Sequence, residues 1–339
     1  MSGQFVFPAE SRFRRALKAL PFLALTVLMT RAFGMAEPIG PTIEEIVSSS
    51  VFTSPGVSVP IIRGFYGVPV LDDIFNIVTV AFANLQFYVD EKAYWQSLTR
   101  KCIPCFQIMI AIGCTAPIFF FLAYVFTPAY KLTTPSLCRL GTGPCKAIYV
   151  SLIVGYYVSH FPSYFNTSLE GRNWWNWIWQ LFPIWTCSIM FVLSKTFTYT
   201  DGAAIEIETE RNLLRGAMGA CSLISMGTWW YTVSTTNDSV FEVFVPQYLV
   251  NFPRDPSVGL RTVIQFDYIC CYTAGYLWLA YHFRDLEKVG VCSISWARAA
   301  VVTVVLSFVV GPGTLFPILW LLREELLMAP NDEVKESDD

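Results

Sequence analysis

Apolar runs long enough to cross a bilayer alternate with polar or Pro- and Gly-rich links along nearly the whole chain. A transmembrane helix needs about 20 mainly apolar residues, because each residue adds about 1.5 Å and the hydrocarbon layer is about 30 Å thick. The runs cover residues 16–34, 68–89, 103–126, 146–165, 175–197, 213–233, 262–283 and 296–322. The pattern predicts an all-α, polytopic membrane bundle of about eight transmembrane helices, with residues 1–328 as one domain and a disordered acidic tail at 329–339.

Composition agrees with a membrane protein, since 54% of the residues are hydrophobic and only 14% are charged. The net charge is only −3, and basic residues are spread singly through the links, so nothing indicates binding to nucleic acid. The first run follows Arg12, Arg14, Arg15 and Lys18 and ends in small residues. It predicts a retained anchor or, alternatively, a cleaved signal peptide that would leave seven helices. We expect a retained anchor and a multi-pass protein of the endoplasmic reticulum.

One run carries a polar stripe along its whole length. The stripe consists of residues three or four apart: Asp72, Asn76, Thr79, Ala83, Gln86 and Asp90. These positions share one helical face, and a carboxylate or amide in hydrocarbon costs several kcal/mol. The stripe should therefore border a cavity or other helices rather than lipid. We expect a cavity; the alternative is that the two acids cap the helix ends while the amides bond to neighbouring helices.

A second stripe follows the run at 262–283, and other runs add aromatic faces. The second stripe comprises Asp267, Cys271, Ala274, Trp278, Tyr281 and Asp285; the further faces carry Tyr149, Tyr156, His160 and Ser163, and Trp229, Trp230 and Tyr231. Desolvated aromatic rings stabilise a cation by up to about 2 kcal/mol, and an acid in an apolar pocket can stay protonated and donate its proton. Together these residues predict a carbocation pocket, although aromatic stripes also pack helices and anchor membrane interfaces.

Several chemistries are poorly supported by the residues present. The chain has only two histidines, His160 and His282, too few for the histidine-rich membrane metalloenzymes, and no serine elbow, Walker loop or dinucleotide fingerprint lies where it could work. Asp72-Asp73-Ile-Phe-Asn76 resembles half of the magnesium motif of prenyl-diphosphate enzymes, but the complementary half is absent. A magnesium-dependent prenyltransferase and a receptor or transporter for a lipophilic ligand remain open as alternatives.

Three segments carry a resemblance to a known family. They are Gly171-Arg-Asn-Trp-Trp-Asn-Trp-Ile-Trp-Gln-Leu-Phe-Pro183, Gly311-Pro-Gly-Thr-Leu-Phe-Pro317 and Leu321-Leu-Arg-Glu-Glu-Leu326. With the number and placing of the apolar runs, they resemble the fungal integral-membrane terpene cyclases of meroterpenoid and indole-diterpene biosynthesis, closest to the ascofuranone-cyclase type. The resemblance implies a cyclase without metal or cofactor, of isomerase or lyase type. In such an enzyme an acid protonates a terminal epoxide on a prenyl chain, and an internal alkene or hydroxyl captures the cation.

The resemblance also implies one essential acid in an early run and one in a late run. Asp267 is the late candidate, and Asp72, Asp73 or Glu91 is the early one. Glu242 is a further candidate, because Ser239–Pro253 reads as an interfacial segment that covers the mouth of a cavity. The expected substrate-binding residues are Asn76, Gln86, Tyr156, His160, Trp229, Trp278 and Tyr281. The expected partners are an epoxidised prenyl aromatic substrate, the lipid bilayer and an upstream monooxygenase of the same pathway.

Overall fold

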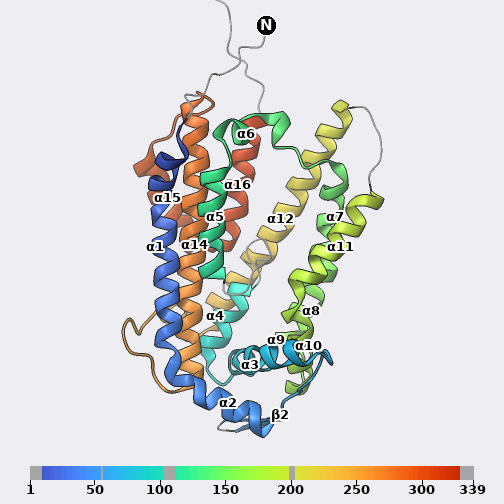
Figure 1. Ribbon diagram of the computed structural model, residues 1–339, viewed down its shortest axis with the longest axis vertical. Helices are drawn as coiled ribbons and strands as arrows, with labels where there is room; N and C mark the ends of the chain where they lie inside the picture. Colours follow the sequence, from blue (N-terminus) through green and yellow to red (C-terminus); the bar gives the residue numbers. More distant parts are fainter. Residues whose placement is uncertain (1–9, 55, 102–111, 198–202, 329–339) are drawn as a thin grey trace, which may run out of the picture.

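The computed structural model describes residues 10–54, 56–101, 112–197 and 203–328 (Figure 1). These residues are almost entirely helical, which confirms the all-α class for the described part of the chain. The exception is an antiparallel hairpin of β1 (Val51–Ser54) and β2 (Val57–Pro60), in which Phe52 lies opposite Val59. The predicted acidic tail at 329–339 lies outside the described residues.

The helices follow the chain in this order. They are α1 (Arg12–Met35), the 3₁₀ helix η1 (Glu37–Ile39), α2 (Gly40–Ser49), α3 (Pro69–Gln86), α4 (Glu91–Lys101), α5 (Ile112–Phe126), α6 (Ala129–Thr133), the 3₁₀ helix η3 (Pro135–Leu137), α7 (Thr142–Leu152), the π-helix η4 (Ile153–Tyr157), α8 (Val158–His160), α9 (Pro162–Phe165), α10 (Leu169–Gln180), α11 (Phe182–Thr196), α12 (Ala203–Thr235), α13 (Val240–Phe244), α14 (Pro256–Lys288), α15 (Trp296–Val310) and α16 (Pro312–Met328).

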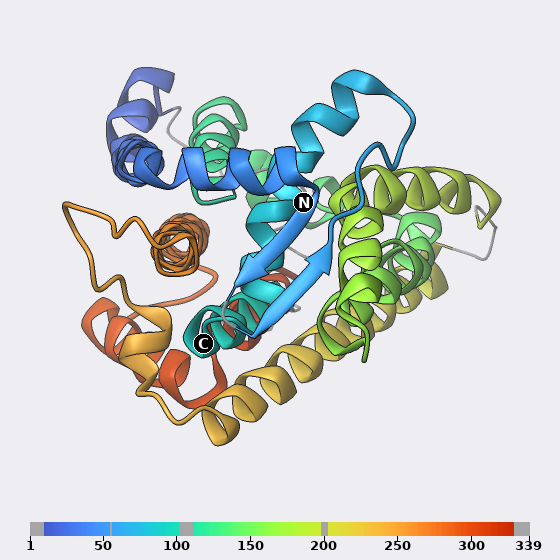
Figure 2. The ribbon, with the colours of Figure 1, turned by 90° about the horizontal axis from the view of Figure 1, so that it is seen from below.

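The long helices run roughly along one axis, so the bundle has two ends (Figures 1 and 2). We call the end with α6 the upper end and the end with α2 and the hairpin the lower end. Helix α1 descends beside α5, which runs the opposite way: Arg15 Nε donates to the carbonyl of Tyr124 at 2.7 Å, and further down Thr26 Oγ1 donates to the carbonyl of Cys114 at 3.4 Å. Helix α14 climbs back along α1, because Tyr281 near its upper end donates to the carbonyl of Lys18.

The run at 296–322, expected to be one span, forms two helices instead. Helix α15 starts at the upper end, where Trp296 Nε1 donates to Glu287 Oε2 at 3.1 Å, and α16 ends close to α6 at the same end. The chain turns between them at Gly311, which has a φ of +83° and lies against Trp229. A Cβ at Gly311 would approach Trp229 Cγ to 2.8 Å. Only glycine combines this φ with so close an approach, so the chain can turn here. The prediction of a single span was therefore wrong, because α15 and α16 are two helices separated by this turn.

Two sharp bends follow or divide predicted spans. The axis turns by 114° between α3 and α4, directly after the predicted span 68–89, and by 53° between α10 and α11, within the predicted span 175–197. In the described residues, one helical segment, Arg12–Ser49, is long and apolar enough to cross a membrane, or up to three if each bent pair counts as one span. This segment makes membrane association possible, but a polytopic bundle of about eight spans is not confirmed, because several apolar runs are divided among shorter helices.

Helix α3 lies across the lower end of the bundle and buries its polar stripe (Figures 1 and 2). Asp72, Asn76, Thr79, Ala83 and Gln86 are all buried, and Val70, Ile74 and Ile77 are exposed. The stripe faces α10, where Asn176 Nδ2 donates to the carbonyl of Thr79 at 3.3 Å. The stripe therefore avoids lipid, as predicted, by facing another helix.

Candidate functional site

A cavity of about 300 Å³ lies between α1, α3, α4, α14 and the bend that joins α10 to α11. Its walls are mainly apolar, with Phe75 and Phe82 from α3 and Trp179 and Phe182 from the bend. Only three of the side chains that line it are charged or carry an amide: Arg100, Gln180 and Asp267. A concave apolar chamber with few polar groups is the usual form of a small-molecule site, and this volume is near the lower limit for such sites.

Asp267 lies in the middle of α14 and forms an ion pair with Arg100 from α4. Both groups are largely withdrawn from solvent, with side-chain exposures of 5% for Asp267 and 13% for Arg100. The other carboxylate oxygen, Oδ1, accepts a hydrogen bond of 2.6 Å from the backbone N–H of Gly113 in α5. A guanidinium and an amide donor both stabilise the ionised carboxylate, so Asp267 enters any reaction as a base or a fixed negative charge unless a ligand displaces Arg100.

Gly113 permits this arrangement, because α5 and α14 approach closely at Asp267. A Cβ at Gly113 would lie 2.8 Å from the Asp267 Cα, its carbonyl oxygen and Oδ1. Real Cβ atoms do not approach backbone so closely, and any larger residue would push the two helices apart. The sequence carries a signal for each of the two residues that contact Asp267. Arg100 is a basic residue just before the apolar run at 103–126, and Gly113 is a glycine inside that run.

Gln180 is the neutral polar group of the cavity wall, and a chain of amides holds it. Its Nε2 donates to Asn176 Oδ1 at 3.2 Å, and Gln86 Nε2 approaches the same oxygen at 3.4 Å and Ser163 Oγ at 3.2 Å. Asn176 and Gln86 are both fully buried. Neither Gln86 nor Asn76, both predicted substrate residues, lines the cavity. Gln86 is connected to the cavity wall through Asn176, which contacts Gln180.

The expectation that the polar stripe borders the cavity is corrected by this geometry. The cavity is lined by the neighbouring apolar face of α3, including Ile74, Val78 and Leu85. Asp72 Oδ1 accepts a hydrogen bond of 2.8 Å from the backbone N–H of Tyr66, and Asp73 is exposed. The two acids thus lie at the start of α3, outside the cavity wall, and nothing in their placement favours the magnesium motif.

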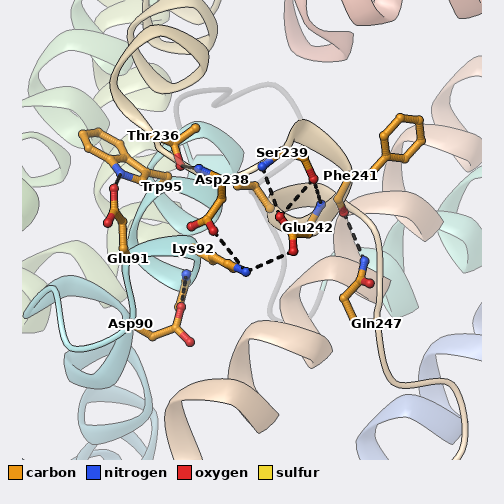
Figure 3. Close-up of polar contacts among 12 residues, drawn as sticks. Asp90, Glu91, Lys92, Trp95, Thr236, Asp238, Ser239, Phe241, Glu242 and Gln247 are labelled. Carbon is orange, nitrogen blue, oxygen red and sulfur yellow. Dashed lines mark hydrogen bonds and ion pairs between the residues drawn. The ribbon is translucent and has the colours of Figure 1, made fainter.

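Glu91 and Glu242 also lie outside the cavity, in a polar cluster where the turn after α12 meets α4 (Figure 3). Lys92 forms ion pairs with Asp238 at 3.1 Å and Glu242 at 3.4 Å, and Glu91 Oε1 accepts a bond of 3.3 Å from Trp95 Nε1. Glu242 also closes a capping box with Ser239 at the start of α13. Hydrogen bonds from Ser239, and then the charge of Lys92, lower the pKa of Glu242. These contacts fasten α13 to α4.

The aromatic candidates divide between two regions. Tyr156 stacks on His160 with a centroid distance of 5.4 Å and packs edge-on against Phe182, so this pair lies directly behind the cavity wall. Trp229, Trp278 and Tyr281 lie elsewhere: Trp229 packs on Phe244, Trp278 on Phe120 and Tyr281 on Tyr124. Of the predicted site residues, only Asp267 lines the cavity itself.

The described residues contain no group of three or more His, Cys, Asp or Glu side chains that could hold a metal ion. They also offer no strand followed by a glycine-rich turn and a helix, the unit that commonly binds a flavin dinucleotide, since the strands of this part of the chain form only the hairpin at 51–60.

Comparison with known proteins found one family and several fungal relatives. The CtvD domain matches residues 90–328, which include Arg100 and Asp267. The FAD-dependent monooxygenase verC1 of Penicillium polonicum is 23% identical over 94% of this chain and 43% of that protein. The FAD-dependent monooxygenase anuJ of Penicillium roqueforti is 22% identical over 66% of this chain and 28% of that protein.

The chain thus spans less than half the length of these curated relatives. A third relative, the FAD-dependent monooxygenase BOA8 of Botryotinia fuckeliana, is 21% identical over 64% of this chain and 28% of that protein. No solved structure matches.

Proposed function

The chain belongs to the CtvD family, and from that premise we propose that it is a membrane-bound cyclase of fungal secondary metabolism, which opens an epoxide on a lipophilic prenylated substrate and closes a ring. The observation that carries the proposal is the Arg100–Asp267 pair at the wall of an otherwise apolar cavity. An apolar cavity with one preorganised ion pair suits a reaction that develops charge and must limit access of water.

The pair can perform a balanced isomerisation. A substrate hydroxyl attacks an epoxide carbon, a new C–O bond forms, and the old C–O bond of the epoxide breaks to leave an alkoxide. Asp267 accepts the proton of the attacking hydroxyl and returns it to the alkoxide, while the Arg100 guanidinium stabilises the negative charge. The product has the same composition as the substrate, so this step needs no oxidant or reductant.

An acid-first route leads to the same class of product. If the substrate displaces Arg100, an Asp267 left in the apolar cavity can hold a proton and donate it to the epoxide oxygen. The cation is then stabilised by the rings of Phe82, Trp179 and Phe182 and captured by an alkene or hydroxyl. In this route Asp267 later recovers a proton from the product, again without a change in composition.

The names of the relatives support an oxygenated substrate. A flavin monooxygenase that acts on an alkene uses O₂ and a reductant and leaves an epoxide, which is the functional group that this site would consume. We propose that a separate flavin-dependent active site supplies the epoxide, as the expected upstream monooxygenase would.

The test is an incubation of microsomes that contain the full chain with an epoxidised farnesyl-phenol, followed by mass spectrometry. We expect a product of unchanged mass and altered retention, formed equally with and without EDTA, and absent with microsomes from cells that lack the gene. A panel of prenyl epoxides that yields no isomer at verified protein level would overturn the proposal, and an isomer that EDTA abolishes would overturn its metal-independent form.

A further inference from the structure

Part of the cavity wall lies at the outer surface of the molecule. Two of the lining residues are large apolar side chains that are also exposed: Phe33 on α1, with 44% exposure, and Ile74 on α3, with 50%. We call the surface at these two residues the mouth. The ion pair at the cavity wall is buried by comparison, so the cavity runs from an exposed apolar mouth toward a buried charged pair.

The surface around the mouth is mainly apolar. On α3, Val70 and Ile77 are exposed on either side of Ile74 along the helix, and the acid exposed on the same face is Asp73. On α11, Ile184 is 54% exposed and directly follows Pro183, which lines the cavity. Exposed apolar side chains gathered from three helices are costly in water and favourable in hydrocarbon.

Helix α1 provides the second argument. Phe33 belongs to Arg12–Ser49, the segment whose length and composition allow it to cross a membrane. Arg31, two residues before Phe33, is exposed, and a long cationic side chain near the end of a membrane helix extends toward the lipid headgroups. The place of Arg31 on this segment favours a mouth in the hydrocarbon close to a headgroup layer.

We propose that the substrate enters the cavity sideways from the bilayer, through the mouth between Phe33 and Ile74, with its prenyl chain first. This inference rests on the proposed function for the identity of the substrate. A prenylated aromatic compound partitions into a bilayer, with its chain among the lipid tails and its polar head near the headgroups. Entry by the chain brings a terminal epoxide to the Arg100–Asp267 pair and leaves the head near the mouth, which suits the acid-first route with capture of the cation by an internal alkene.

The size of the cavity agrees with this orientation. About 300 Å³ is at the small end of the range for drug-sized ligands. The cavity is therefore suited to the chain of a farnesyl-phenol rather than to the whole molecule. Substrates with different aromatic heads should then be accepted, whereas a shortened prenyl chain would not bring its epoxide to Asp267.

The first test compares Ile74→Trp with Val70→Trp. Val70 lies one turn earlier on the same helix and is more exposed, at 69%, but does not line the cavity. We expect Ile74→Trp to lower kcat/KM for the epoxidised farnesyl-phenol at least tenfold by obstructing the mouth, and Val70→Trp to change it less than twofold. Equal effects of the two substitutions would overturn the route.

A second test does not depend on turnover. Photoreactive p-benzoylphenylalanine placed at Ile74, and separately at Val70, is irradiated in vesicles that contain farnesyl-phenol without an epoxide. We expect labelling by the probe at position 74, suppressed by excess epoxidised substrate, and only weak, uncompeted labelling at position 70. Competed labelling at position 74 without any isomer would contradict the proposed reaction. Isomer formation with equal labelling at both positions would contradict the proposed entry route.

Discussion

Two buried acids on α14, Asp267 and Asp285, have different surroundings. They are 3% and 1% exposed and eighteen residues apart, which is about 27 Å along the helix. Asp267 pairs with Arg100 from a different helix and borders the cavity. Asp285 pairs with Lys288 on its own helix at 2.7 Å and does not line that cavity.

The upper region around Asp285 fastens helices to one another. Arg15 of α1 lies 4.2 Å from the centroid of the Tyr124 ring of α5 and donates to the carbonyl of the same residue. The Tyr281 ring packs on Tyr124 at 4.7 Å. Charged and aromatic groups thus gather in both regions, and in the lower one they border a cavity of about 300 Å³. Burial alone does not distinguish the two acids as candidates; the adjoining cavity does.

The largest expected effect comes from breaking the lower ion pair. Arg100→Leu leaves a buried carboxylate without its counter-charge, so we expect the free energy of unfolding to fall by about 3–5 kcal/mol. Lys288→Leu is the matched change at the upper acid; because Lys288 is 39% exposed, water can take the place of its ammonium beside Asp285, and we expect a smaller loss than for Arg100→Leu. Denaturant unfolding in detergent measures both, and equal losses would remove the distinction between the two pairs.

The double variant Arg100→Leu/Asp267→Leu sharpens this result. It replaces two charges by apolar side chains of comparable size, so it should recover most of the stability lost in the single variant while remaining inactive. A double variant as unstable as Arg100→Leu alone would show that the loss came from packing rather than from the unpaired charge.

The next effect concerns the approach of α5 to Asp267. Gly113→Ala forces a methyl group into backbone at 2.8 Å, so we expect a loss of about 1–3 kcal/mol of stability and at least a tenfold fall in turnover. Gly219→Ala on α12, where nothing lies within 4 Å, should instead be stabilising by about 0.5–1 kcal/mol with normal turnover. The close packing is refuted if the two alanine variants behave alike.

A smaller effect is expected from the amide chain behind Gln180. Asn176→Leu leaves the buried amide of Gln86 and the half-buried amide of Gln180 without their shared partner, which should cost about 1–3 kcal/mol. Asn212→Leu, at an exposed amide of α12, should change stability by less than about 0.5 kcal/mol. The same unfolding assay compares the two variants. Similar values for both would mean that the hydrogen bonds between the buried amides do not stabilise the fold.

The smallest effect is the pH dependence of the Glu242 capping box. The pKa of Glu242 lies below the ordinary 4.5 because Ser239 donates hydrogen bonds to its carboxylate and the positive charge of Lys92 is nearby. A group with a lowered pKa in the folded state contributes stability that is full above pH 4.5 and disappears as the pH falls through the lowered pKa. Glu242→Gln should therefore be slightly less stable than the parent at pH 7 and equal to it at low pH. A difference that persists at low pH would contradict this origin.

The sequence predicted the helices better than the site. Periodicity located α1, α3, α12 and α14 because each carries a long apolar pattern, and it identified the buried stripe of α3. It could not show the turn at Gly311 or the 114° bend after α3, since both depend on contacts between distant segments. Asp267 was predicted from its place on an aromatic face, whereas Arg100 and Gln180 were missed because α4 and α10 enter the cavity wall only through tertiary packing.

The most direct test of the central claim is the rate of isomer formation by Asp267→Asn and Asp285→Asn in microsomes at matched protein levels. Asparagine keeps the shape of each side chain but removes its charge and its capacity to carry a proton. We predict that Asp267→Asn loses at least 100-fold in rate, while Asp285→Asn keeps the rate within about threefold. Full turnover in Asp267→Asn, or an equal loss in both variants, would contradict the assignment of the chemistry to the cavity.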